Sequence, residues 1–129
     1  RVDVIMGCVD NAKTRTLLND AAIRHRKPYY DGRTDFTVGQ VSAYHPGQNR
    51  CLDCRFNFSD MPDLTNSCGD PNVMPSVVTV NMFAGTQLAK GVLNQDLRYN
   101  DSVYFSSTAR QRFGMTENTV GSRECDCYG

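Results

Sequence analysis

The pattern of apolar and polar positions divides the first thirty residues into a short apolar run and an amphipathic segment. Residues 2–9 have the dense apolar pattern of a strand covered on both faces: Val2, Val4, Ile5, Met6 and Val9. From residue 11 to residue 27, apolar positions recur at helical spacing until Pro28 stops the helix. This part of the chain is therefore predicted to form a βα unit.

The remaining pattern predicts a mixed set of strands, turns and one long helix. Short strands are expected at residues 29–30, 38–44, 103–105 and 112–115, with turns at 31–35 and 45–49. Residues 50–75 have the composition of a long functional loop. A helix over residues 76–95 is expected to be well buried, with these residues on its apolar surface: Val77, Val78, Val80, Met82, Phe83, Ala84, Leu88 and Val92. Gly85 and Gly91 would allow that helix to approach the sheet closely.

Length and charge limit the classes of function. The 129 residues fit one domain or part of one, and 14 basic residues balance 14 acidic ones. Such a balance gives no general attraction to nucleic acid or to a membrane surface. No apolar run approaches the roughly 20 residues of a membrane span, and the start lacks the pattern of a signal peptide. Because the chain begins at Arg1, almost directly in a predicted strand, we expect it to be cut from a longer protein.

Six cysteines are a high number for this length. In a small secreted chain they would indicate three disulfides, and that alternative stays open. A chain of this size needs no covalent staples, however, and Cys8 falls in the predicted core strand, where it is expected to be a buried apolar residue. We therefore favour a reducing, cytoplasmic location.

Four of the cysteines have the arrangement of a metal site. Cys51 and Cys54 form a CxxC pair, and Cys125 and Cys127 form a second pair near the C-terminus. Structural zinc takes four such ligands, so a closed, non-catalytic zinc is predicted to staple the Cys51 loop to the end of the chain. The CxC spacing is tight, and Cys68, His45 or an intermolecular ligand could replace one member. A redox CxxC normally lies at a helix N-terminus, whereas this one is predicted to precede a loop.

Asp10 and Asn11 lie where the first predicted strand ends and the first helix begins. Ligands of open α/β sheets bind at the carboxyl ends of parallel strands, where a carboxylate and an amide can reach a metal-bound phosphate. Both residue types are also common helix caps, and the tetrapeptide at residues 8–11 alone favours the cap.

An ordered set of motifs resembles a known family. Its members are Cys8-x-Asp10-Asn11-x-x-Thr14-Arg15, Leu18-Asn19, Pro28, Gly39-Gln40-Val41 and Cys51-x-x-Cys54. This set is similar to the second half of the ThiF/MoeB/E1 superfamily, whose members activate ubiquitin-like and sulfur-carrier proteins. The resemblance covers roughly residues 2–95, and the terminal cysteines match more loosely.

The resemblance implies a partial Rossmann-like α/β fold of the E1 type, a mixed sheet with helices and a zinc-stapled loop. It implies binding of ATP and Mg²⁺ and adenylation of the C-terminal glycine of a β-grasp partner. Asp10 would hold magnesium, Asn11 would contact the nucleotide or acyl-adenylate, and Arg15 would form a local charge pair. Cys68 would be a nucleophile toward the acyl-adenylate, with a zinc ligand or an inert thiol as its alternatives.

The 129 residues depart from the family in one respect. They contain no glycine-rich nucleotide loop, and the basic residues that would clasp phosphate ahead of Asp10 are absent. These residues alone are therefore expected not to adenylate a substrate. A non-catalytic E1-like subunit or a zinc-stapled interaction module is the alternative function, and a homo-oligomer or a partner chain is expected in either case.

Overall fold

A computed structural model describes the backbone of residues 1–34, 38–61, 78–94, 100–106 and 111–117, together with Cys125 and Cys127. The elements in chain order are β1 (Ile5–Gly7), α1 (Ala12–His25), β2 (Tyr29–Thr34), β3 (Val38–Tyr44), α2 (Leu52–Phe56), the 3₁₀ helix η1 (Phe58–Asp60), α3 (Val78–Asn94), β4 (Asn100–Ser106) and β5 (Gln111–Glu117). They form a mixed α/β fold, as predicted.

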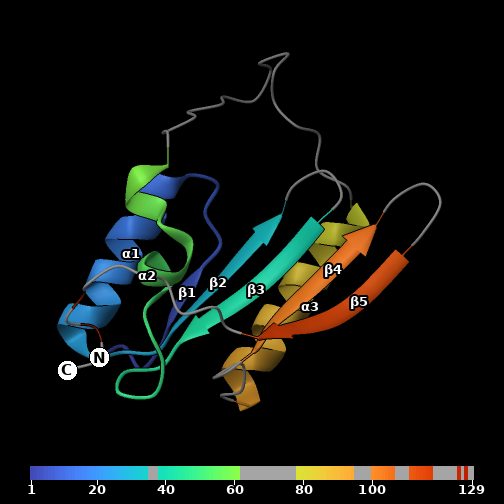
Figure 1. Cartoon of the computed structure of the whole chain (residues 1–129). Coiled ribbons are helices and arrows are strands. Elements are labelled where there is room, and N and C mark those ends of the chain that lie inside the picture. The colour runs from blue at the N-terminus through green and yellow to red at the C-terminus, as the bar shows by residue number, and fades with distance from the viewer. Residues whose placement is uncertain are drawn as a thin grey trace.

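The strands form a single sheet in the order β1-β2-β3-β4-β5 (Figure 1). Strands β1 and β2 are parallel, as a βαβ crossover through α1 requires, and the other neighbours are antiparallel. Helices α1 and α2 cover one face of the sheet, and α3 covers the other (Figure 1). The expected final pair of strands is confirmed as the β4–β5 hairpin.

Successive side chains of β2 and β3 point to opposite faces of the sheet, so the hydrophobic core has two parts, one on each face. Tyr29 and Tyr44 pack with Leu52 and Phe58 on the side of α1 and α2. Tyr30, Val41 and Ala43 pack against Ala84 and Leu88 of α3 on the other side. Each tyrosine of the Tyr29-Tyr30 pair is fully buried, because successive strand residues point to opposite faces and both faces are covered.

The first helix forms as its sequence predicts. Asn11 is its N-cap, and the Asn11 side chain accepts a hydrogen bond from the Thr14 backbone N–H at 2.8 Å. At the other end Arg26 adopts a left-handed conformation, and the Lys27 N–H donates to the Ala22 carbonyl at 2.9 Å. The helix therefore holds residues 10 and 11 in a defined position directly after β1.

The structure corrects several expectations about the first strand. Strand β1 has only three residues, and it is an edge strand of the described sheet. Met6 in this strand is 45% exposed, and Val2, which precedes it, is 59% exposed, so the prediction of a strand covered on both faces is wrong. Cys8, expected to be buried in this strand, lies beyond its end and is exposed.

Residues 31–34 were expected to turn, but β2 continues through them to Thr34. Asp31 is fully buried inside the strand, where two arginines pair with it. Gly7 of β1 lies close to this aspartate, and a Cβ added at Gly7 would lie 2.9 Å from Asp31 Oδ1 and 2.8 Å from the Tyr29 hydroxyl. Only glycine allows β1 to approach so closely.

The two segments that follow also differ from expectation. The predicted loop over residues 50–75 contains α2 and η1, and its residues 62–75 lie outside the described part of the chain.

The inner face of α3 is confirmed by buried Val80, Ala84 and Leu88, whereas Val78 and Met82 are about two-thirds exposed. A Cβ at Gly85 would meet nothing within 4 Å, so this glycine does not serve close packing. No helix among the described residues is long and apolar enough to cross a membrane.

Candidate functional site

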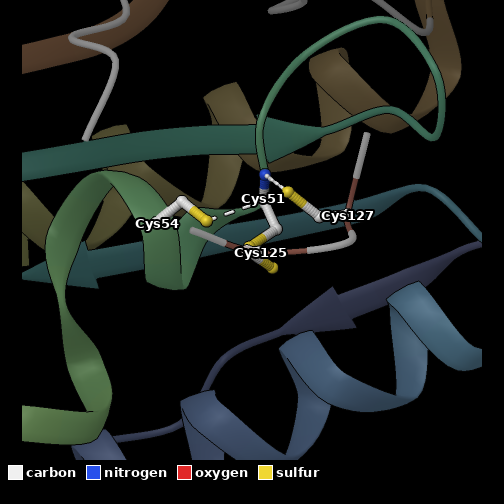
Figure 2. Close-up of side chains that lie close together, drawn as sticks. All are labelled: Cys51, Cys54, Cys125 and Cys127. Carbon is white, nitrogen blue, oxygen red and sulfur yellow. Dashed lines mark hydrogen bonds between the residues drawn. The ribbon is translucent and has the colours of Figure 1, made fainter. Parts of the chain in front are cut away.

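Four cysteines from distant parts of the chain gather beside α2, and their side chains point toward one another (Figure 2). All four Sγ atoms of Cys51, Cys54, Cys125 and Cys127 lie within 4.8 Å of one another. The Cys51–Cys125 and Cys54–Cys127 sulfur distances are 3.9 and 3.8 Å. The grouping predicted from the two short motifs is therefore confirmed, and the cluster can hold a metal ion.

Buried hydrogen bonds from three elements hold the cluster in place. Cys51 caps the N-terminus of α2, and its backbone N–H donates to the sulfur of Cys127 at 3.4 Å. The Tyr44 hydroxyl at the end of β3 donates to the Cys127 carbonyl at 2.9 Å. Asn19 of α1 is 1% exposed, and its Oδ1 accepts from the Leu52 and Asp53 N–H groups at 3.0 and 3.3 Å. Asn19 thus fixes the first turn of α2, a role that its position in the sequence did not indicate.

Thiol acidity varies across the cluster. Burial raises the pKa of Cys51 to about 11 and also raises the pKa of Cys54. Burial acts in the same direction on Cys127, but hydrogen bonds from the Cys51 backbone and from the neighbouring thiols leave the pKa of Cys127 lowered. Without a positive ion, the Cys51 and Cys54 sulfurs therefore hold their protons, and a metal ion would have to displace them.

Of the two residues considered from the sequence as alternative metal ligands, the structure describes His45 but not Cys68. His45 does not join the cluster: it is buried beside Tyr30, whose hydroxyl lies 3.0 Å from its Nε2. Cys68 lies outside the described residues. The CxxC segment does begin a helix, contrary to the expectation of a loop, but α2 has only five residues and its two thiols face two further cysteines.

An open cleft of about 490 Å³ lies at the carboxyl ends of β1 and β2. Its lining residues are Cys8, Val9, Asp10, Arg15, Gly32, Arg33, Thr34, Val38 and Gln40. Asp10 is exposed at this cleft, and the Asn11 amide nitrogen donates to its Oδ1 at 3.1 Å. Asn11 is therefore the helix cap, and its amide also orients the neighbouring carboxylate.

Two arginines that line the cleft, Arg15 and Arg33, belong to a buried charge network around Asp31. The Arg15 Nε lies 3.2 Å from Asp31 Oδ2, and the Arg33 Nε lies 3.7 Å from the same oxygen. The Tyr29 hydroxyl donates to Asp31 Oδ1 at 3.0 Å. Burial raises the pKa of Asp31, while both guanidinium groups act to lower it. The ion pair with Asp31 confirms the expectation of a local charge pair for Arg15, which also donates to the Val9 carbonyl at 2.7 Å.

This network leads to a prediction about stability. The substitution Asp31→Asn would leave two guanidinium groups buried beside a neutral amide, and it is expected to lower the free energy of unfolding by about 3–5 kcal/mol. Urea unfolding followed by circular dichroism measures the loss. The matched variant Asp20→Asn, at an exposed position on α1, is expected to change stability by no more than about 0.5 kcal/mol. Equal stability of the two variants would contradict the role given to Asp31.

Comparison with known proteins identifies the family. The model of the ThiF family matches residues 1–128. The chain belongs to the ThiF family. This ThiF-family chain is 37% identical over 78 residues to the adenylyltransferase and sulfurtransferase MOCS3 of Drosophila persimilis, a match of 60% of the chain and 17% of that protein. It is 39% identical over 75 residues to MOCS3 of Drosophila ananassae, covering 58% of the chain and 17% of the relative.

Solved structures share the fold at lower identity. The crystal structure of E. coli MccB superposes with a TM-score of 0.72 at 14% identity, covering 98% of this chain and 40% of MccB. The structure of E. coli MccB with ATP gives a TM-score of 0.65 at 16% identity, covering 98% and 39%. The ThiF-family chain thus spans well under half the length of these proteins, and the likeness shows a common E1-like fold.

Proposed function

We propose that the chain is part of an ATP-dependent enzyme that adenylates the C-terminal glycine of a ubiquitin-like or sulfur-carrier protein. The observation that carries the proposal is the exposed carboxylate of Asp10, oriented by Asn11 at a cleft beyond the carboxyl end of β1. The family supports it, because the MOCS3 relatives are named adenylyltransferases and MccB has been solved with ATP.

The residues of the cleft fit a magnesium nucleotide. A volume of about 490 Å³ lies within the usual range for small-molecule sites, and a carboxylate oxygen is a ligand that Mg²⁺ prefers. Magnesium would neutralise phosphate charge there. Attack of the glycine carboxylate on the α-phosphate, with pyrophosphate as the leaving group, requires alignment and charge neutralisation rather than a strong base. Asp10 would hold the metal, and the Asn11 amide would keep the Asp10 carboxylate in position.

The four-cysteine cluster is proposed to hold structural zinc. A tetrahedral site with Zn–S bonds of about 2.3 Å places neighbouring sulfurs about 3.8 Å apart. The measured distances of 3.8 and 3.9 Å agree with that separation. Four protein sulfurs complete the coordination, so the ion would have no open position for a substrate and its role would be structural.

Cys68 is proposed as a nucleophile that acts after adenylation. Its thiolate would attack the carbonyl carbon of the acyl-adenylate, form a thioester and release AMP through the phosphate oxygen. Four other cysteines already provide the four ligands of a tetrahedral zinc ion, so Cys68 is not needed as a zinc ligand. An inert thiol remains the competing role. Cytoplasmic location and assembly into a homo-oligomer belong to the same proposal.

ATP–pyrophosphate exchange in the full-length protein tests the proposed activity. We expect exchange that depends on a small β-grasp partner ending in Gly-Gly. The alternative of a non-catalytic E1-like subunit or zinc-stapled interaction module is favoured by one observation, the four-cysteine cluster, which would stabilise the fold without contacting a substrate. Tight binding of the partner without any exchange in the full-length protein would favour that alternative.

A substitution at Asn11 separates helix capping from ligand contact. Serine is an equally good N-cap, so Asn11→Ser is expected to leave the melting temperature nearly unchanged. The variant lacks the amide that donates to Asp10, and we expect about a tenfold lower exchange rate, the value of one lost hydrogen bond to a charged group. Unchanged exchange at unchanged stability would limit Asn11 to capping.

A further inference from the structure

Arg33 connects the cleft to the cysteine cluster through an aromatic ring. Its guanidinium carbon lies 3.8 Å from the centroid of the Phe56 ring, which is stacking distance, and 5.4 Å from the centroid of the Phe58 ring. The two rings are themselves stacked, with centroids 5.7 Å apart and planes at 24°. Arg33 also lines the cleft, so one side chain contacts both regions.

Phe56 is part of the same short helix as the cluster. It is the last residue of α2, two positions after Cys54, and α2 begins at the residue that follows Cys51. A helix of five residues has little stability of its own. The position of Phe56 therefore depends on the contacts that hold α2, which include the Asn19 hydrogen bonds to its first turn, the sulfurs gathered beside it, buried Leu52 and the hydrogen bond from Arg55 to the Ala43 carbonyl.

Arg33 contacts both a carboxylate and an aromatic face. The Asp31 carboxylate lies 3.7 Å from its Nε. The Phe56 ring stacks on the guanidinium and orients its plane, since guanidinium groups stack well on aromatic faces. A guanidinium fixed in this way at the wall of a cleft is suited to a carboxylate or a phosphate.

We infer that Phe56 is a positioning residue that couples the four-cysteine site to the cleft by holding Arg33 where it binds an anionic group of the ligand. The ligand part of this inference rests on the proposed function, whereas the positioning part does not. The anionic group is either a phosphate of the nucleotide or the terminal carboxylate of the carrier protein. When the cysteines release their metal, α2 loses one of its anchors, and the stacking of Arg33 on Phe56 becomes less ordered.

Calorimetric titration of the metal-loaded full-length protein tests the ligand part. The probes are Mg-ATP and a synthetic peptide that ends in Gly-Gly with a free carboxylate. For Phe56→Leu we expect about a fivefold higher Kd for one of the two probes, the value of a partly desolvated cation–π contact. The matched variant Phe56→Tyr keeps the ring and is expected to bind like the unaltered protein. Arg33→Lys is expected to weaken the same probe, with no further loss when it is combined with Phe56→Leu.

The NMR resonance of the Arg33 Nε–H group tests the positioning part without any ligand. A proton near an aromatic face is shifted by the ring current, and we expect this shift to decrease in Phe56→Leu, where only the more distant Phe58 ring remains, and after chelation of the metal. An unchanged resonance in both samples, or an unchanged Kd for both probes in a folded Phe56→Leu variant, would overturn the inference. If the unaltered protein binds neither probe, the proposed function fails, and the resonance alone decides the role of Phe56.

Discussion

Replacement of Asp10 by alanine is expected to slow ATP–pyrophosphate exchange by about 10²–10³-fold, the usual cost of losing one preorganised group that stabilises transition-state charge. The carboxylate is exposed at the cleft, where it can bind Mg²⁺. Because the Asp10 side chain makes no packing contact in the core clusters, the melting temperature should change little. The measurement is partner-dependent exchange in the full-length protein, with the folded state checked by thermal unfolding.

Asp20→Ala provides a matched control for this experiment. Asp20 is an exposed aspartate of α1 and is not among the residues that line the cleft, so its loss removes the same charge without touching the proposed magnesium site. We expect normal exchange in this variant. If Asp10→Ala and Asp20→Ala exchanged at the same rate, Asp10 would have no role in binding magnesium, and the proposed site would have to be sought elsewhere.

The parts of the fold that were predicted correctly depend on local signals. Helical spacing before Pro28 predicted α1, and alternation before the turn at residues 45–49 predicted β3 with its observed ends. The inner face of α3 followed from the spacing of Val80, Ala84 and Leu88. In each case the physical cause lies within a few residues: a repeat that matches the element, a cap or a breaker.

The errors arose where a distant partner decides the structure. Asp31-Gly32 has the composition of a turn, yet the chain stays extended because Arg15, sixteen residues earlier, pairs with the buried carboxylate. Apolar content alone also could not show that Met6 and Met82 are exposed, since the pattern does not reveal which surfaces other elements cover. These errors therefore concern burial and pairing more than the order of the elements.

The candidate site also contains residues that local sequence signals predict and residues whose roles depend on distant contacts. The cysteine pairs and Asp10 were recognisable, because metal ligands and strand-end carboxylates have characteristic types and spacings. Asn19 and Phe56 were not assigned their roles, since an asparagine in a helix and a phenylalanine in a loop have no such signature. Their importance follows only from the contacts with α2 and with Arg33.

Loss of the proposed zinc is expected to have the largest effect on stability. Structural zinc in small peptides contributes about 10 kcal/mol or more, which is comparable with the whole stability of an ordinary domain of about 5–15 kcal/mol. The substitution Cys54→Ser removes one sulfur from the cluster and should abolish tight zinc binding. We expect unfolding of α2 and of the region that packs on it, measured as a lower melting temperature together with loss of zinc in elemental analysis.

Cys8→Ser makes the same chemical change outside the cluster. Cys8 is exposed and is not among the four gathered sulfurs, so this variant should keep its zinc and its melting temperature. Thiol titration in denaturant with a chelator adds an independent test, because a zinc protein should release all six thiols and a disulfide-linked one fewer. A Cys54→Ser variant that retains one zinc per chain would show that this sulfur is not a ligand. If instead the unaltered protein contained no metal and had fewer than six thiols, the four cysteines would be a disulfide site, and the coupling of α2 to the cleft would not depend on zinc.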